Sequence, residues 1–240
     1  EARQQGVPPQ ARRPFSKEEF IQVVTVCSQF RNPNIKYGIP ALMKFAFHLI
    51  ARLDDSCELK SVNFKVNARY PDTLLTRLRW SKNVHDERDA PNQILLGAMD
   101  ADYCVLLGLG LHLETTISEV SDQSGSFFSL RRTMTKLANG FVSSALQEKV
   151  LKHKDFLKQF VGELGSHSVQ KHASTHACRN GSSKDDVDSH GQWKKHACQQ
   201  DKYTDVDLLY LDRKMAIVLC VGGAYKYICK MGVHVANEWI

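Results

Sequence analysis

Apolar residues recur at helical spacing along most of this 240-residue chain, whereas strand-like stretches occur only near its middle. Those stretches are residues 61–67, 74–81 and 93–97. Strands and helices do not alternate regularly along the chain, so a doubly wound parallel sheet is not expected. The pattern predicts a mainly α fold with a small antiparallel β-sheet, which places the chain in the α+β class.

Local signals mark where several helices begin. Ser16 with Glu19 three residues later fits a capping box, and Pro40 stands at a first-turn position. The helix expected at 149–164 has an apolar face formed by Phe156, Leu157, Phe160, Val161 and Leu164. The expected helices cover residues 16–30, 40–53, 101–115, 130–146, 149–164, 166–179, 183–191, 211–221 and 223–231.

Composition and charge restrict the partners. No apolar run reaches the ~18–20 residues that a membrane span needs, so no membrane association is expected. The net charge of +6 is uneven: residues 128–171 carry eight Lys or Arg against three Asp or Glu, and residues 183–212 carry four against seven. A basic band beside an acidic one suits a polyanion, nucleic acid first, although a solvated helix face would explain the same excess.

The seven cysteines are scattered without paired spacing, which is typical of buried thiols in a reducing, intracellular compartment. No secretory signal is visible before the first expected helix. Residues 1–15 are polar and contain several prolines, so we expect a flexible N-terminal extension.

A cluster of histidines and cysteines at residues 165–198 raises the alternative of a zinc-stabilised interaction domain. His172 and His176 stand four residues apart on one expected helix and therefore share a face. Further ligands could come from Cys178, His190, His196 and Cys198. No C-x2-C or H-E-x-x-H motif occurs among them, so we expect no metal here.

A second set of residues has the chemistry of a phosphoryl-transfer site. In "ARLDDSCEL" at 51–59, Arg52 precedes Asp55 by three residues, so the acid could orient the guanidinium. Lys82 begins the charged turn "KNVHDERDAPN" between two expected strands, from which its long side chain could reach into a cleft. His167, Gln170 and Lys171 share one face of the helix at 166–179.

Trp193 and, ten residues later, Tyr203 complete the set. In this order the parts resemble the catalytic domain of the tyrosine recombinases, the lambda-integrase family. "ARLDDSCEL" is similar to the first arginine box, "SKNVHDERDAPNQILLG" to the lysine hairpin and "HSVQKHASTHACRNGSSKDDVDSHGQW" to the second box. "DKYTDVDLLYLDRKMA" is similar to the crypton-type recombinases of eukaryotic mobile elements, and the resemblance covers about residues 15–231.

The resemblance implies a recombinase-like catalytic domain at 16–240, with residues 1–15 as the linker from an absent helical DNA-clamp domain. It implies a site-specific recombinase that acts on double-stranded DNA as a homotetramer, through a 3′-phosphotyrosine and without cofactor or metal. We expect such a protein in the nucleus or elsewhere inside the cell. Tyr203 would attack the phosphate, Arg52 would clamp it with support from Asp55, and Lys82 would protonate the leaving oxygen. His167 would assist proton transfer, and Trp193 would donate a hydrogen bond through its indole N–H.

One position departs from that pattern. The family has arginine three residues after the histidine, where this chain has Gln170 with Lys171 beside it. Glutamine donates a hydrogen bond but supplies no charge and no bidentate fork. Because loss of one charge-stabilising donor costs on the order of 10²–10³ in rate, a catalytically impaired DNA-binding relative is the alternative function.

Overall fold

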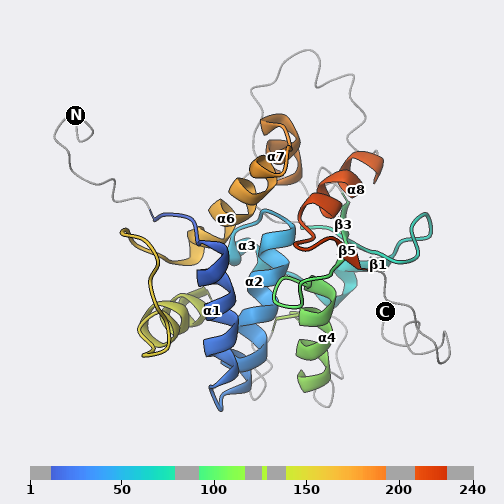
Figure 1. The fold of residues 1–240 in the computed structure, drawn as a ribbon. Helices are drawn as coiled ribbons and strands as arrows, with labels where there is room; N and C mark the ends of the chain where they lie inside the picture. The colour runs from blue at the N-terminus through green and yellow to red at the C-terminus, as the bar shows by residue number, and fades with distance from the viewer. Residues whose placement is uncertain (1–11, 79–91, 117–125, 129–138, 193–208, 226–240) are drawn as a thin grey trace, which may run out of the picture.

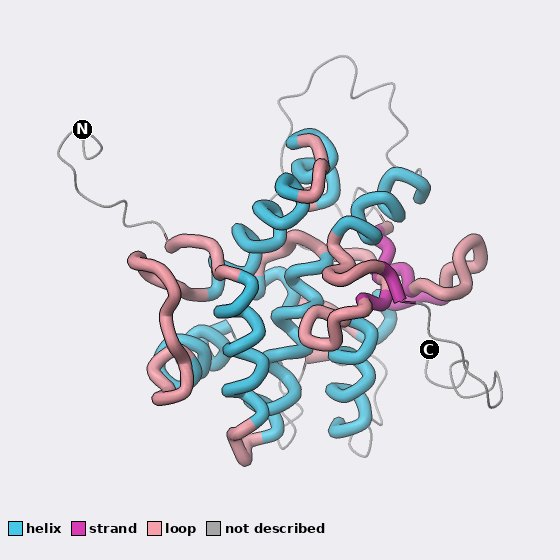
Figure 2. Tube along the Cα trace, viewed as in Figure 1, coloured by secondary structure: helices cyan, strands magenta, loops and turns pink. Residues whose placement is uncertain are grey.

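A computed structural model of the chain describes residues 12–78, 92–116, 126–128, 139–192 and 209–225 (Figure 1). Helices make up most of this part, and the strands gather on one side of it (Figure 2). The prediction of a mainly helical fold with a small antiparallel sheet is confirmed. Within the described ranges, no helix is both long enough and apolar enough to cross a membrane.

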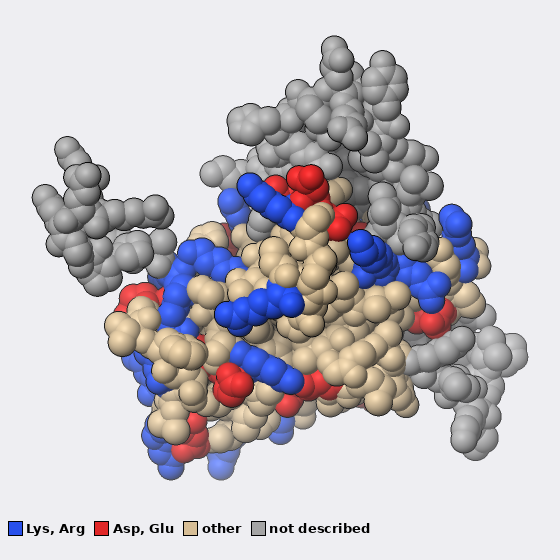
Figure 3. All heavy atoms as spheres, turned by 45° about the horizontal axis from the view of Figure 1, so that its top comes forward, with Lys and Arg blue, Asp and Glu red and all other residues tan. Residues whose placement is uncertain are grey.

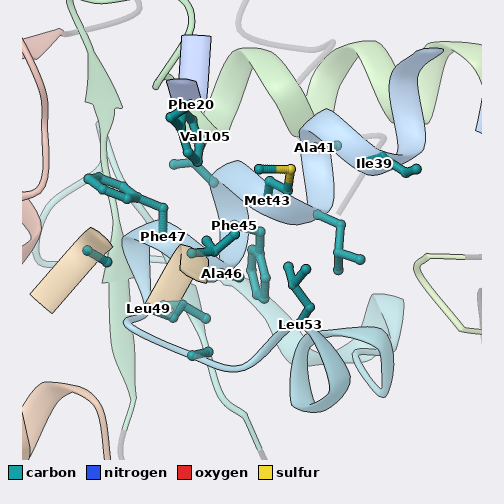
Figure 4. Packing of buried hydrophobic residues seen from close by; sticks show 14 of the residues in the cluster. Phe20, Ile39, Ala41, Met43, Phe45, Ala46, Phe47, Leu49, Leu53 and Val105 are labelled. Carbon is teal, nitrogen blue, oxygen red and sulfur yellow. The ribbon is translucent and has the colours of Figure 1, made fainter. Parts of the chain in front are cut away.

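Helix α2 (Ile39–His48) lies at the centre of the core, and each of its ten residues is buried. It packs against α1 (Lys17–Ser28) on one side and α4 (Val105–Thr116) on another, and the short π-helix η1 (Asn34–Gly38) leads into it. Figure 4 shows the side chains of α2 among their apolar neighbours. A helix that is apolar on all sides must be surrounded by other elements, and here the helices around α2 cover it.

An aromatic cluster joins three helices at this centre. Phe20 of α1 stacks on Tyr103 with ring centroids 4.5 Å apart, and Phe47 of α2 lies 5.2 Å from the ring of His172. The Tyr103 hydroxyl is hydrogen-bonded to His172 Nε2 at 2.8 Å. Because His172 belongs to α6 (Ser166–Arg179), the cluster fixes α6 against α1 and α2.

The predicted capping box of α1 is present and extends into a larger buried network. Ser16 Oγ accepts from the Glu19 N–H at 3.1 Å, and Glu19 Oε2 accepts from the Ser16 N–H at 3.0 Å. Glu19 is fully buried, and both of its oxygens accept from the Arg13 guanidinium at 2.6 Å. Phe15 is also buried, so the chain from Arg12 to Phe15 is held against the protein.

The helix expected at 40–53 is wrong after His48. Helix α2 ends at His48, Ile50 adopts a φ of +50°, and a new helix, α3 (Leu53–Cys57), begins with Arg52 as its N-cap residue. Asp54 and Asp55 stand in the first turn of α3, where the helix dipole favours acids. The apolar pattern runs through the break without interruption, so periodicity alone could not show it.

The predicted three-stranded sheet is confirmed. β1 (Phe64–Val66), preceded by the 3₁₀ helix η2 (Ser61–Asn63), pairs antiparallel with β2 (Leu74–Thr76). β2 in turn pairs antiparallel with β3 (Gln93–Leu95), with Thr76 opposite Gln93. β2 and β3 are therefore the two arms of the hairpin that the sequence predicts.

A second, two-stranded sheet was not expected. β4 (Gly97–Ala98) pairs antiparallel with β5 (Ala224–Tyr225). Gly222 and Gly223 have φ values of +78° and +107°, which glycine adopts readily, and they belong to the turn that leads into β5. The helix expected at 223–231 is therefore wrong over its first residues, and residues 226–231 lie outside the described part.

The helix expected at 149–164 is also wrong. Helix α5 (Asn139–Ser144) continues into the π-helix η5 (Ala145–Val150), and residues 151–165 are irregular. Two of their backbone N–H groups bond to side chains of α1, with Leu157 N donating to Gln22 Oε1 at 2.8 Å and Gln159 N to Glu19 Oε1 at 2.7 Å. The expected apolar face divides: Phe156 and Leu164 are buried, whereas Leu157, Phe160 and Val161 are exposed.

Three helices complete the fold, and all were predicted with small shifts in their bounds. Gly165, rather than Ser166, is the N-cap of α6. α7 (Lys184–His190) has Ser183 and Asp186 as its capping box, and acids stand in its first turn, where the helix dipole favours them. α8 (Leu209–Val218) packs against β3 and α7.

Candidate active site

The turn that leads into Arg52 is the centre of the candidate site. We call residues 48–52, from the last residue of α2 to the N-cap of α3, the Arg52 turn. Arg52 itself is partly exposed. Burial raises the pKa of Asp55, while the positive charge of Arg52 acts in the opposite direction, so the two side chains interact electrostatically. The role of Asp55 as a support for Arg52 stays a prediction.

Gln170 reaches the Arg52 turn from α6. Its Nε2 donates a hydrogen bond to the carbonyl oxygen of Ile50 at 3.0 Å, and α6 packs against α3. Ile50 is fully buried and has the left-handed φ of +50°, which a β-branched residue rarely adopts. The structure therefore brings together the predicted residue Gln170 and the backbone that presents Arg52.

The other two predicted residues of α6 have different surroundings. His167 is exposed on the first turn of the helix. Lys171 is half-buried, and its Nζ donates to the carbonyl oxygen of Arg12. Lys171 thus contacts the N-terminal chain, and Gln170 alone of the three is hydrogen-bonded to the Arg52 turn.

Lys82, Trp193 and Tyr203 lie outside the described residues, but the elements that flank them are described. Lys82 belongs to the connection between β2 and β3, whose pairing the structure shows. Trp193 and Tyr203 fall in the sequence between α7 and α8. The helices at both ends of that connection contact each other.

The contact between α7 and α8 contains a pair of side chains that sequence reasoning missed. His190 Nδ1 lies 2.7 Å from Asp212 Oδ1, and His190 Nε2 donates to the carbonyl oxygen of His48 at 2.9 Å. Asp212 Oδ2 accepts from the backbone N–H of Ile94 in β3. The residues stand 22 positions apart in sequence, so no local spacing could have indicated the pair.

The electrostatics of His190 follow from these contacts. Burial opposes the charged imidazolium, but the Asp212 carboxylate and the hydrogen bonds to Asp212 and to the His48 carbonyl outweigh it and raise the pKa of His190. His48 shows the opposite behaviour, because burial lowers its pKa to about 4 despite its hydrogen bond to the Tyr103 carbonyl.

The residues of the zinc alternative are not assembled into a site in the part that the structure describes. His172 is bonded to Tyr103, His176 Nε2 donates to the Val218 carbonyl oxygen at 3.2 Å, and His190 is bonded to Asp212. Across the described ranges, no group of three or more His, Cys, Asp or Glu side chains is placed to hold a metal ion. His196 and Cys198 lie outside those ranges.

The predicted basic band falls largely on η5 and the irregular chain after it. Four of its lysines are exposed there: Lys149, Lys152, Lys154 and Lys158. Figure 3 shows that Lys and Arg side chains form several separate groups on the face that it presents, with Asp and Glu side chains between them. Such a surface can contact phosphate groups at several points but does not by itself identify a partner.

Comparisons with known proteins supply a fold relationship. No protein-family model matches the chain, and no curated protein matches it in sequence. The XerH site-specific recombinase bound to difH substrate, in a pre-cleavage complex, superposes with a TM-score of 0.55 at 12% identity, over 88% of this chain and 55% of that one. The XerH post-cleavage complex with a palindromic difH substrate superposes with a TM-score of 0.55 at 13% identity, over 88% of this chain and 56% of that one.

A lambda integrase tetramer bound to a Holliday junction gives a TM-score of 0.54 at 14% identity, over 84% of this chain and 51% of that one. The chain thus spans about half the length of the solved structures that it matches. At these identities the similarity concerns the fold alone. This mainly helical chain with its small antiparallel sheet therefore has the fold of tyrosine recombinase catalytic domains.

Proposed function

We propose that this chain is the catalytic domain of a site-specific DNA recombinase that cuts and rejoins DNA through a 3′-phosphotyrosine intermediate. The observation that carries the proposal is the fold similarity to recombinases solved with DNA, over at least 84% of this chain. The hydrogen bond that ties α6 to the Arg52 turn adds support, because it joins two of the predicted boxes. The crypton-type origin and the nuclear location stay predictions from sequence resemblance.

The chemistry requires cations around one phosphate. A phosphodiester is already negative, and further charge develops on its oxygens during transfer, so fixed positive groups lower the barrier. Arg52, supported by Asp55, would hold the phosphate, and Lys82 would protonate the leaving 5′-oxygen. Tyr203 would form the covalent bond to the 3′-phosphate. His167 would assist proton transfer, and the Trp193 indole would donate to a phosphate oxygen.

Gln170 favours a second candidate function. Its amide is bonded to the Ile50 carbonyl and adds no positive charge to the site. A recombinase fold that lacks this cation would still bind DNA but would cut it slowly. A catalytically impaired DNA-binding relative is therefore the alternative, and it predicts salt-sensitive DNA binding without a covalent adduct.

The assembly follows from the same reasoning. We expect double-stranded DNA as the partner and a homotetramer on DNA as the active form. The solved neighbours are DNA complexes, one of them a tetramer on a Holliday junction. The match covers only 55% and 51% of the neighbours' own length, so tetramer formation by this part alone belongs to the proposal.

The test is covalent trapping. The protein is incubated with nicked duplexes whose sequence is randomised around the nick, and detergent-resistant protein–DNA adducts are isolated. The wild type should form an adduct, and Tyr203→Phe should abolish it. Tyr225→Phe, at an exposed tyrosine of β5, is the matched control and should keep it.

The result of the trapping experiment distinguishes between the two candidate functions. An adduct that survives Tyr203→Phe removes Tyr203 as the nucleophile. DNA binding without any adduct in the wild type supports the impaired relative instead. Absence of DNA binding even at low salt contradicts both functions.

A further inference from the structure

The connection between α7 and α8, residues 191–208, has both of its ends tied to each other. His190 is the last residue of α7, and Asp212 stands in the first turn of α8. Their side chains meet at 2.7 Å and are 1% and 15% exposed. The contact therefore fixes the positions of α7 and α8 between which the connection runs.

Hydrogen-bond donors and acceptors assign a charge to this pair. His190 Nε2 faces the carbonyl oxygen of His48, which can only accept, so Nε2 carries a proton. His190 Nδ1 faces the Asp212 carboxylate, which as an ionised group also only accepts. Both ring nitrogens therefore donate, and the pair is an imidazolium with a carboxylate.

The pair is anchored to two further elements. Asp212 also accepts from the Ile94 N–H of β3, and Gln93 Nε2 of β3 donates to the His190 carbonyl oxygen at 2.7 Å. On the other side, His190 holds the His48 carbonyl, which belongs to the Arg52 turn. The same turn is held at Ile50 by Gln170.

We call this connected set of hydrogen bonds, made by Gln170, His190, Asp212 and Gln93, the frame. α6 and α7 each hold one carbonyl of the turn that presents Arg52, and α7 also holds α8. The sequence between α7 and α8 contains Trp193 and Tyr203. A nucleophile and a phosphate clamp must be held in register within a fraction of an ångström for reaction, and they come from distant parts of the chain.

Resting on the proposed function, we infer that His190 and Asp212 are positioning residues, which fix both ends of the Tyr203 segment relative to the Arg52 turn. They touch neither DNA nor the reacting atoms in this scheme. Their role is to reduce the number of arrangements in which Tyr203 and Arg52 are too far apart or wrongly oriented.

The structure offers a matched control on the same two helices. Lys214 of α8 and Asp186 of α7 form an ion pair at 3.6 Å whose side chains are 56% and 30% exposed. This exposed pair joins α7 to α8 as the buried pair does, but it has no bond to β3 or to the Arg52 turn among the described contacts. Loss of a helix–helix ion pair as such can therefore be separated from loss of the frame.

The experiment compares Asp212→Asn, His190→Gln and Asp212→Glu with the control Lys214→Gln. The rate of covalent adduct formation is measured with protein in saturating excess over nicked duplex, together with the dissociation constant for DNA. We expect Asp212→Asn and His190→Gln to lower that rate at least tenfold, with the dissociation constant changed less than twofold. Asp212→Glu, which keeps the carboxylate, should have an adduct rate within about threefold of wild type. Lys214→Gln should have the wild-type adduct rate.

Tryptic cleavage of the native proteins gives a readout that does not need activity. Lys194, Lys195 and Lys202 lie between α7 and α8. Cleavage there should rise at least fivefold in Asp212→Asn and His190→Gln, and should stay within twofold of wild type in Lys214→Gln. If Asp212→Asn does not fold, the adduct rate and the cleavage rate are measured on His190→Gln alone.

The outcomes distinguish the two proposals. Wild type that forms no adduct counts against the proposed function, and the inference is then decided by the cleavage result. Folded variants of the buried pair that keep both the adduct rate and the cleavage rate of wild type overturn the inference. A drop in adduct rate that Lys214→Gln reproduces equally also overturns it.

Discussion

The side-chain amide of Gln170 donates a hydrogen bond to the carbonyl oxygen of Ile50, 3.0 Å away, and Ile50 holds the left-handed φ of +50°. A β-branched residue adopts this conformation at a cost of about 1–2 kcal/mol, so the surroundings must stabilise it. Gln170 supplies one such contact at the residue two positions before Arg52. The neutral side chain at this position therefore has a structural role, whatever it does for the phosphate.

Replacing Gln170 by Ala should lower the free energy of unfolding by about 1–2 kcal/mol, because the buried carbonyl of Ile50 loses its donor. Urea unfolding followed by circular dichroism measures the change. His167→Ala, at an exposed position of the same helix, is the control and should change the free energy by less than about 0.5 kcal/mol. Equal effects of the two substitutions would show that the Gln170 bond contributes nothing.

Replacing Gln170 by Arg should raise the rate of covalent adduct formation by about 10²-fold, because it adds a cation beside the Arg52 turn. Single-turnover trapping on nicked duplex at saturating protein measures this rate. Lys171→Arg, a change that preserves charge at the neighbouring position, should leave the rate within about threefold. A Gln170→Arg protein no faster than wild type would mean that the missing charge does not limit the reaction.

Acid should destabilise the protein through its buried neutral histidines. Burial lowers the pKa values of His48 and His172 to about 4, below the value near 6.5 of an unfolded chain. Between pH 6.5 and 4 the unfolded state binds protons that the folded state excludes, so stability falls by up to about 1.4 kcal/mol per pH unit for each histidine. His190, whose pKa is raised, is protonated in both states below pH 6.5 and adds little slope there.

His172→Gln should weaken this acid sensitivity, because glutamine can keep the bond to the Tyr103 hydroxyl but does not titrate. Urea unfolding from pH 7 to 4.5 should give a smaller loss for the variant by about 1–2 kcal/mol over that range. Identical slopes for His172→Gln and wild type would contradict a buried neutral His172.

Among the polar residues, Glu19 should make a large contribution to the free energy of unfolding. It accepts from both ends of the Arg13 guanidinium and from the N–H groups of Ser16 and Gln159. Glu19→Ala leaves these donors without an acceptor and should cost about 2–4 kcal/mol in urea unfolding. Glu163→Ala, which breaks only the exposed pair with Lys158, should cost less than about 1 kcal/mol.

Local signals determined the elements that were predicted correctly. The capping box at Ser16 and Glu19, the acids in the first turn of α7 and the short strands at the middle of the chain involve neighbours in sequence. The caps act through bonds within three residues, and each strand pairs with the next strand along the chain. The order of the boxes similarly indicated a fold that the solved neighbours share.

The errors arose where tertiary contacts outweighed local preference. Residues 151–165 have a helical apolar pattern, but the N–H groups of Leu157 and Gln159 bond to side chains of α1, and Leu157, Phe160 and Val161 remain exposed. Helix α2 stops at His48 although the apolar pattern continues. In both places the competing bonds come from residues far away in sequence, which no window of the sequence contains.

The candidate site divides in the same way. The sequence by itself determined which residue types are available, and the order of its motifs predicted that Arg52, Asp55 and Gln170 belong to the site. Only the tertiary structure decided that Gln170 is bonded to the Ile50 carbonyl while Lys171 turns to Arg12, and that His190 and Asp212 pair in the interior. The physical reason is that a buried polar group must find a partner wherever the fold places one, and that partner can be any distance away along the chain.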